Sequence, residues 1–312
     1  MQFERLGNSG LQITQVSFGT ALTIGTERKD DDYAFSLIDT AWDLGIRSFD
    51  VSNNYGMGEA ERLTGKALAR YPRQEYVIST KGSWPVGEGC YYKGLSRKHI
   101  LWALDESMKR IGLDYIDIYY AHRYDPNVSM EEIVRVFNYL ICTGRIRYWA
   151  TSEWPVEALE ECHRVCEKLG MEKPILDQFI YSFAVRKAET NGVVDFCQKN
   201  KVGMMGFSPL CQGFLTGKYR NGIPENSRIA KKDLLSYNKT INFYEQNKKR
   251  IDGFLSFCEK YHLKGAQVAL MWNIRQHIYP VVGASKPEQL LDIFSTEFPV
   301  ITEVMWKELE TI

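Results

Sequence analysis

A short apolar run, a loop and an amphipathic helical stretch recur eight times along the 312 residues of the chain. Each helical stretch is long enough to carry the chain back to the same end of a sheet, as a right-handed parallel crossover requires. Eight such crossovers predict a closed (β/α)8 barrel, and barrels of this size fold as one domain, here residues 1–312. The catalytic groups of such a barrel gather where its strands end.

The expected ranges follow from the change between runs of β-branched or aromatic residues and stretches with a helical period. They are residues 16–19 with 32–44, 48–50 with 59–70, 76–81 with 96–111, 115–121 with 130–143, 146–151 with 155–169, 175–178 with 192–200, 202–207 with a later helix, and 278–282 with 287–294.

Three further segments flank or interrupt this repeat. Residues 3–13 alternate apolar and polar around the turn sequence GNSG, which predicts an N-terminal hairpin that plugs one end of the barrel. Residues 211–242 are a long polar excursion, typical of a functional lid or of disorder, and residues 301–312 predict one more helix. A doubly wound sheet is the competing architecture, but Gly19 and Gly25 lack the spacing of its phosphate-binding turn.

Composition and charge narrow the classes of partner. The chain has 39 basic and 39 acidic residues, so it carries no electrostatic footprint for nucleic acid or for an anionic membrane. It has neither a long apolar run nor a signal segment at Met1, and we expect a cytoplasmic protein. The seven scattered cysteines are typical of free thiols. Cys162, His163 and Cys166 lie within one helical turn but lack further ligands, so we expect no metal.

Four titratable residues lie at or near the ends of predicted strands. Asp50, Lys81 and His122 close the runs SFD, VISTK and IYYAH, and Tyr55 lies in the loop after Asp50. Each alone has an ordinary structural explanation, as a loop cap, a surface charge, a rim histidine or a half-buried aromatic. Because the strand ends of a barrel share one rim, their joint placement indicates a proton-donating site.

These residue types suit the reduction of a carbonyl. Hydride transfer to a carbonyl leaves charge on its oxygen, which must then receive a proton. Tyrosine, with a pKa of about 10, is a poor acid at neutral pH unless a cation stabilises its phenolate. We expect Lys81 to lower the pKa of Tyr55, and Asp50 to hold Lys81 charged and in place. His122 is expected to donate to the substrate oxygen and to orient it.

The sequence resembles the aldo-keto reductase superfamily over almost its whole length. The matching segments are FDVSNNYGMGEAERLTGKAL, ISTKG, YIDIYYAHR, GRIRYWATSEW, DQFIYS, FSPLCQGFLTGKY and VVGASKPEQL, and their order and spacing are more specific than any one motif. The resemblance implies a catalytic tetrad of Asp50, Tyr55, Lys81 and His122. It also implies an NADPH-dependent oxidoreductase that reduces an aldehyde or ketone to an alcohol, with Tyr55 as the proton donor.

The resemblance further implies that an extended nicotinamide cofactor, usually NADPH, crosses the mouth of the barrel without a Rossmann domain. Its nicotinamide end would meet Thr20, Ala21 and Asp50, its carboxamide Ser152 and Gln178, and its ring would stack on Tyr181. The pyrophosphate side would meet Phe207, Ser208, Pro209, Leu210 and Gly213, with Lys218 and Arg228 as a partial lid. Gly283, Ser285, Lys286 and Gln289 would hold the adenosine 2′-phosphate.

Two points leave the cofactor preference open. Lys286 is also explained as a solvated surface charge, in which case NADH is not excluded. Where close relatives carry Glu–Asn near the adenine, this chain has Asp292 and Ile293, so adenine affinity or cofactor preference is expected to differ.

The motifs YWATSEW and SPLCQGFLTGKY…GIPENSR resemble the branch that contains the β subunits of voltage-gated potassium channels and related bacterial reductases. An NADP(H)-binding regulatory subunit with weak or vestigial activity is therefore the alternative function. The channel subunits have asparagine where this chain has His122, which favours an enzyme. A barrel with lyase or isomerase chemistry is the third hypothesis.

The substrate is expected to be a small-molecule carbonyl compound, and the branch includes reductases of sugars and keto-sugars. Besides Tyr55 and His122, the aromatic residues expected around the pocket are Trp84, Tyr91, Tyr92, Tyr124, Trp149 and Trp154, each of which ordinary loop packing also explains. An aromatic wall suits a sugar or an aromatic aldehyde equally. Members of the branch occur as monomers and as larger assemblies, so a homo-oligomer is one expectation.

Overall fold

The computed structural model of the protein describes residues 1–225, 227, 229–230 and 233–312. Eight parallel strands close into a barrel in which β10 pairs with both β9 and β3, which confirms the predicted (β/α)8 fold. The strands are β3 (Ser17–Gly19), β4 (Ser48–Asp50), β5 (Val77–Gly82), β6 (Ile116–Ala121), β7 (Ile146–Ser152), β8 (Leu176–Ile180), β9 (Gly203–Phe207) and β10 (Tyr279–Val282).

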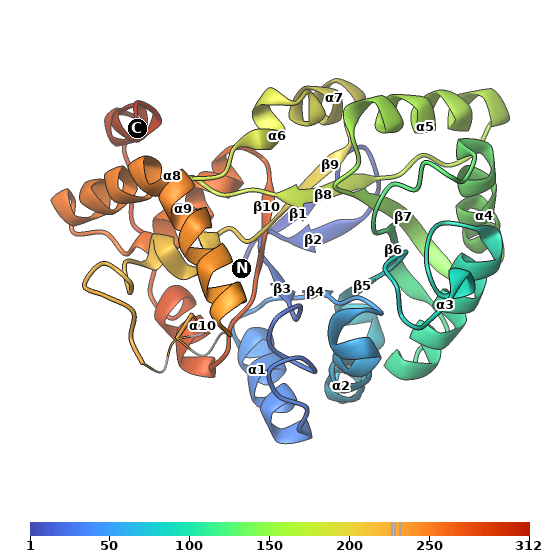
Figure 1. The fold of residues 1–312 in the computed structure, drawn as a ribbon, viewed down its shortest axis with the longest axis horizontal. Helices are drawn as coiled ribbons and strands as arrows, with labels where there is room; N and C mark the ends of the chain where they lie inside the picture. Colours follow the sequence, from blue (N-terminus) through green and yellow to red (C-terminus); the bar gives the residue numbers. More distant parts are fainter. Residues whose placement is uncertain (226, 228, 231–232) are drawn as a thin grey trace.

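Helices surround the strands and alternate with them along the chain (Figure 1). They are α1 (Asp31–Asp43), α2 (Glu59–Leu68), α3 (Arg97–Ile111), α4 (Met130–Cys142), α5 (Val156–Leu169), α6 (Lys187–Thr190), α7 (Val193–Asn200), α8 (Leu234–Lys260), α9 (Gly265–Arg275), α10 (Pro287–Phe294) and α11 (Glu303–Glu310). Several begin at side-chain caps, as α4 does where Ser129 accepts from the N–H of Glu132. No helix among the described residues is long and apolar enough to cross a membrane.

The apolar core has two layers, because successive residues of a strand face opposite sides of the sheet. Phe49, Ile78 and Tyr119 belong to the outer layer, between the strands and the helices. Ile118 and Tyr120 belong to the inner layer, inside the barrel. Their side chains fill the barrel below the site, so that the site rests on a packed floor.

The N-terminal hairpin, β1 (Phe3–Arg5) paired with β2 (Gln12–Thr14), confirms the predicted antiparallel turn. Leu6 and Ile13 join the inner core layer, so the hairpin covers the end of the barrel opposite the strand ends. Gly7 allows this closure, because a Cβ there would clash with the backbone oxygen of Lys201 and its φ is +54°.

The segment after β9, which was expected to be a long irregular excursion, contains regular structure. Residues Cys211–Thr216 form a 3₁₀ turn, and α8 already begins at Leu234, within the range expected to be irregular. Helix α8 packs against this turn and against α9. The short helix α6 also lies outside the predicted elements, whereas α11 matches the expected C-terminal helix.

Candidate active site

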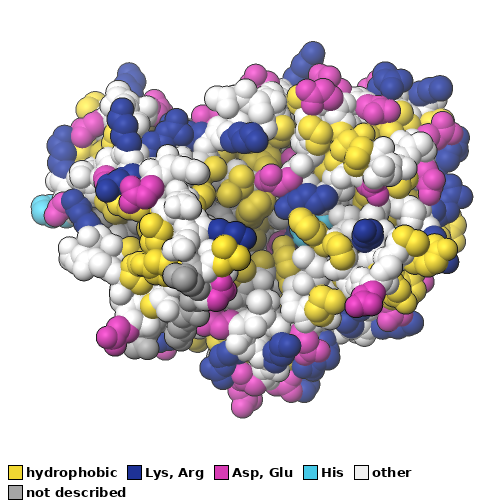
Figure 2. Space-filling model, viewed as in Figure 1, with side chains coloured by type: hydrophobic (Ala, Val, Ile, Leu, Met, Phe, Trp, Pro, Cys, Tyr) yellow, Lys and Arg dark blue, Asp and Glu magenta, His cyan; other side chains and the backbone are white. Residues whose placement is uncertain are grey.

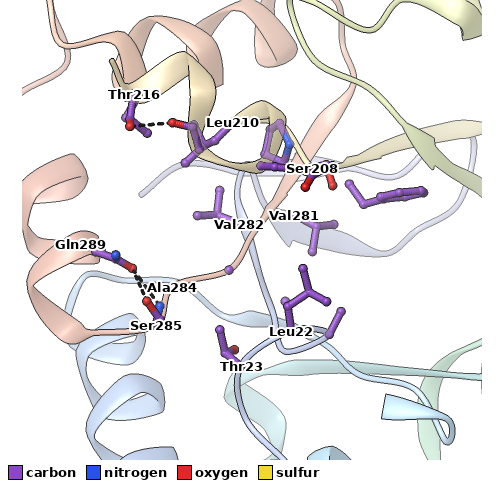
Figure 3. Close-up of a pocket in the computed structure, with 18 of the residues that line it drawn as sticks. Leu22, Thr23, Ser208, Leu210, Thr216, Val281, Val282, Ala284, Ser285 and Gln289 are labelled. Atoms are coloured by element: carbon purple, nitrogen blue, oxygen red, sulfur yellow. Dashed lines mark hydrogen bonds between the residues drawn. The ribbon is translucent and has the colours of Figure 1, made fainter. Parts of the chain in front are cut away.

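A cavity of about 1140 Å³ lies at the carboxyl ends of the strands. In the space-filling view it is the hollow near the middle of the face, with hydrophobic and basic side chains around it (Figure 2). Figure 3 shows its walls, where the loop after β3 (Leu22, Thr23), the end of β10 (Val281, Val282) and the segment Ser208–Thr216 converge. This volume exceeds that of most sites for drug-sized ligands, about 300–1,000 Å³, and suits an elongated ligand.

The floor of the cavity contains a buried ion pair between neighbouring strands. Lys81, whose side chain is 0% exposed, donates from Nζ to Asp50 Oδ2 at 2.5 Å and to the backbone oxygen of Val51 at 2.9 Å. The other carboxylate oxygen of Asp50 accepts from Ser79 Oγ at 2.7 Å and from Gln178 Nε2 at 3.4 Å. Every oxygen of the buried carboxylate thus has a donor, as a buried charge requires.

Tyr55 lies above this pair, with its ring centroid 5.2 Å from Lys81 Nζ. It follows β4 on a tight turn in which Gly56 has φ +58°, and a Cβ on Gly56 would clash with the backbone oxygen of Gly25. Burial raises the pKa of Tyr55 above 10, and the positive charges of Lys81 and Arg123 only partly offset this rise. Lys81 thus lowers the pKa of Tyr55 as expected, but burial has the larger effect, so the pKa is raised overall.

His122 directly follows β6 and faces Tyr55, with their ring centroids 6.1 Å apart and nearly perpendicular. Burial and the charges of Lys81 and Arg123 hold the pKa of His122 well below 6.5, so the imidazole is neutral at pH 7. Its Nδ1 lies 3.2 Å from Ser52 Oγ, which donates its proton to Asn54 Oδ1 at 2.6 Å. A neutral imidazole carries one N–H, and this geometry places it on Nδ1. His122 can donate to a ligand from Nε2 only when the Ser52 hydroxyl turns from Asn54 to Nδ1.

Arg123 is a cavity residue that the sequence analysis missed. Its Nη1 donates to the backbone oxygen of His122 and to Ser152 Oγ at 3.1 Å, and its Cζ lies 5.4 Å from the ring centroid of Trp84. The sequence signal was its position directly after His122, two residues beyond a strand end. That signal alone does not distinguish a cavity arginine from a surface one.

The predicted cofactor residues divide into three groups. Those that line the cavity are Ala21, Asp50, Ser152, Gln178, Phe207, Ser208, Pro209, Leu210, Gly213, Lys218, Gly283, Ser285, Lys286, Gln289 and Asp292. Thr20 and Tyr181 do not line it, and Arg228 lies outside the described residues. Lys81, likewise, lies beneath the cavity surface.

Tyr181 is fully buried, and its hydroxyl donates to Glu189. Because Gln178 faces the cavity from β8, a residue three positions later faces the opposite side. Phe207, at the end of β9, is the aromatic ring that this part of the cavity does contain. The expectation that Tyr181 stacks on the nicotinamide ring was therefore wrong, because the side chain lies outside the cavity.

The far end of the cavity lies at the start of α10. Gln289 Oε1 accepts from the backbone N–H of Ser285 at 2.8 Å and from its hydroxyl at 3.3 Å (Figure 3). Asp292 is paired with Lys264 at 2.8 Å, while Ile293 presents an apolar wall. An acid–lysine pair and an isoleucine therefore occupy the place where the resemblance led us to expect Glu–Asn.

Of the aromatic residues expected around the substrate, Trp84 lines the cavity, is 42% exposed and lies 6.3 Å from the His122 ring. Trp149 instead stacks on Phe137 of α4 and is fully buried, because it faces the helices. Tyr124 packs on Trp154, and neither ring lines the cavity. Tyr91 and Tyr92 are exposed and also lie off its lining. These five residues are corrections to the predicted wall.

No group of three or more His, Cys, Asp or Glu residues within the described part of the chain could hold a metal ion. Cys162 and Cys166 are free and buried, as are three other cysteines. Burial also lowers the pKa of His163 to about 4, which leaves its ring neutral.

Comparison with known proteins matches residues 15–312 to the aldo/keto reductase family. A protein of Schizosaccharomyces pombe named as a voltage-gated potassium channel β subunit is 36% identical, over 99% of this chain and 92% of its own length. A protein of Arabidopsis thaliana with the same kind of name is 34% identical, over 100% and 96%. A second S. pombe protein, named as an aryl-alcohol dehydrogenase, is 32% identical, over 98% and 93%. All three names are provisional. The chain belongs to the aldo/keto reductase family.

Proposed function

We propose that the protein reduces an aldehyde or ketone to the alcohol, with NADPH as the hydride donor and Tyr55 as the proton donor. The observation that carries this proposal is the buried Asp50–Lys81 pair beneath Tyr55 and beside His122, in a large cavity at the strand ends. Membership of the aldo/keto reductase family supports the same chemistry.

The residues that line the cavity fit a dinucleotide. Ser152 and Gln178 offer hydrogen-bonding groups at one end, and Phe207 offers a ring face. The turn Ser208–Gly213 brings the backbone close to the middle of the cavity. Glycine is needed in this turn, because a Cβ on Gly213 would lie only 3.0 Å from Lys218 Nζ. Ser285 and the exposed Lys286 precede α10 at the other end. When bound, the cofactor would supply the hydride.

The chain's own residues handle the proton. The raised pKa of Tyr55 keeps the phenol protonated at pH 7, so that it can donate to an oxyanion. After that transfer Lys81 Nζ stabilises the phenolate, and Asp50 holds Lys81 in place. Neutral His122 lies beside Tyr55 and can orient the substrate oxygen by a hydrogen bond.

We favour NADPH over NADH because Lys286 and the N-terminal N–H groups of α10 can bind a phosphate at this end of the cavity, where Glu288 is the nearby acid. Gln289 Oε1 accepts from both the backbone N–H and the hydroxyl of Ser285. The Gln289 side chain must therefore rotate away before Ser285 can donate to a phosphate. Replacing Ser285 and Lys286 together by alanine is expected to weaken NADPH binding at least tenfold more than NADH binding. Equal losses in a titration of both cofactors would contradict the 2′-phosphate assignment.

The alternative function is an NADP(H)-binding regulatory subunit, which the names of two relatives suggest. His122, a group able to donate to a carbonyl oxygen, favours the enzyme. The two functions separate when the protein is mixed with NADPH and then with 4-nitrobenzaldehyde. Binding seen by NADPH fluorescence, followed by steady loss of NADPH absorbance, supports the reductase. Binding without turnover across a panel of aldehydes and keto-sugars supports the regulatory subunit, and no binding refutes both.

A further inference from the structure

A second cavity of about 430 Å³ adjoins the active-site cavity. Trp84 and Arg123 line both, so the two spaces meet along these side chains. The other walls of this side cavity come from the loop after β5 and from the loop after β6. The side cavity therefore extends from the reacting end of the active site, away from the far end near α10.

Ser83 is an unusual member of this lining. It is 7% exposed, and its hydroxyl has no hydrogen-bond partner among the described residues. A buried hydroxyl without a partner destabilises the protein, and a hydrogen bond to a ligand atom in the side cavity would offset this cost. Its position in the lining indicates a polar ligand atom at this place.

Arg123 supplies a cation at the junction. Among the described residues only its Nη1 donates, and no carboxylate lies within ion-pair distance, although the charge of Glu153 acts on Arg123 from farther away. Nε and Nη2 therefore remain for a ligand. Burial lowers the pKa of Arg123 from its ordinary value, which reflects partial desolvation. A desolvated guanidinium of this kind binds carboxylates and phosphates with two parallel hydrogen bonds.

The acid in the side cavity, Asp125, forms no ion pair with Arg123 among the described residues. Asp125 Oδ1 accepts from the backbone and side-chain nitrogens of Asn127 at 3.0 and 3.3 Å. Its Oδ2 accepts from the backbone N–H of Leu95 at 3.0 Å. Asp125 therefore ties two loops together, while the exposed Lys93 adds a second positive charge to the lining.

We propose that the side cavity binds an anionic group of the substrate, a carboxylate or a phosphate, through Arg123 and Ser83. The preferred substrates are then carbonyl compounds that carry an anion, with Trp84 packed against the part of the molecule between the two groups. This inference rests on the proposed reductase function and specifies its substrate class.

The test compares matched aldehydes that differ in charge. One pair is 4-formylbenzoate and 4-formylbenzamide, which are close in shape, and the other is glyceraldehyde 3-phosphate and glyceraldehyde. In the wild type, kcat/KM is expected to be at least tenfold higher for the anion of one pair. The pair that shows the preference distinguishes carboxylate from phosphate.

Variants identify the residues responsible. Arg123→Gln should reduce the anion-to-neutral ratio to about one, Arg123→Lys should keep part of it, and Ser83→Ala should lower it severalfold. Arg164→Gln is the matched control, because Arg164 is an exposed arginine on α5 and the ratio should not change. A wild-type ratio near one for both pairs, or a ratio unchanged in Arg123→Gln and Ser83→Ala, overturns the proposal.

Failure of the reductase function gives a different pattern, in which neither member of either pair oxidises NADPH. The side cavity is then tested by calorimetric titration with benzoate, benzamide and inorganic phosphate. Binding of an anion that Arg123→Gln abolishes supports the anion site. No binding of either anion by the wild type overturns it.

Discussion

Replacing Lys81 by methionine tests whether the buried ion pair is as tightly built as its distances indicate. Methionine has a similar length without the charge, so the substitution leaves Asp50 buried and without its cationic partner. Breaking a buried pair in this way costs about 3–5 kcal/mol. Ser79 Oγ and Gln178 Nε2 still donate to the carboxylate, so we expect the lower end, about 3 kcal/mol.

The assay is urea unfolding at pH 7 without cofactor, with the double variant Asp50→Asn/Lys81→Met measured alongside. The double variant also removes the unpaired Asp50 charge, so it should recover at least half of the unfolding free energy that Lys81→Met loses. Lys173→Met is the control, because its pair with Glu167 is exposed and should cost less than about 1 kcal/mol. A loss below about 1 kcal/mol in Lys81→Met, or a double variant no more stable than the single, would refute this reasoning.

Two further predictions concern neighbouring buried groups. Ser52→Ala removes the hydroxyl 3.2 Å from His122 Nδ1, so kcat for aldehyde reduction should fall about three- to tenfold with little change in KM, and Ser52→Thr should restore it; an equal fall in both variants would contradict this role. Burial raises the pKa of Asp177 from 3.8 to about 8, so this carboxyl's contribution to stability is present below about pH 4 and is lost as the pH rises to 8. Four pKa units correspond to about 5 kcal/mol, and Asp177→Asn should remove that slope from urea unfolding measured between pH 4 and 8, whereas the exposed control Asp195→Asn should keep it.

The sequence predicted the barrel because each strand and helix has a local pattern. It predicted that Asp50, Lys81 and His122 lie together because each lies at or next to the end of such a strand. It did not predict which way side chains face near the strand ends. Strand β7 runs to Ser152, so Trp149 lies well inside it and alternation turns its ring toward α4. The same alternation buries Tyr181 outside the cavity.

Other features depended on tertiary packing, which a local pattern does not contain. The pKa of Tyr55 is set mainly by how deeply the ring is buried, and the sequence specified only its charged neighbours. Arg123 became a candidate only when the loops after β5 and β6 were seen to enclose it with Ser83. Residues 211–242 were expected to be a lid or disordered because they are polar, although Cys211–Thr216 form a turn that packs against α8, and α8 also packs against α9.

The central claim is that Tyr55 donates the proton to the substrate oxygen. The most direct measurement is aldehyde reduction by Tyr55→Phe, a substitution that keeps the ring and removes only the hydroxyl, together with a titration of NADPH fluorescence on the same preparation. We predict that kcat falls by at least a hundredfold while the NADPH dissociation constant changes by less than about threefold. A variant that retains most of its turnover would contradict the claim.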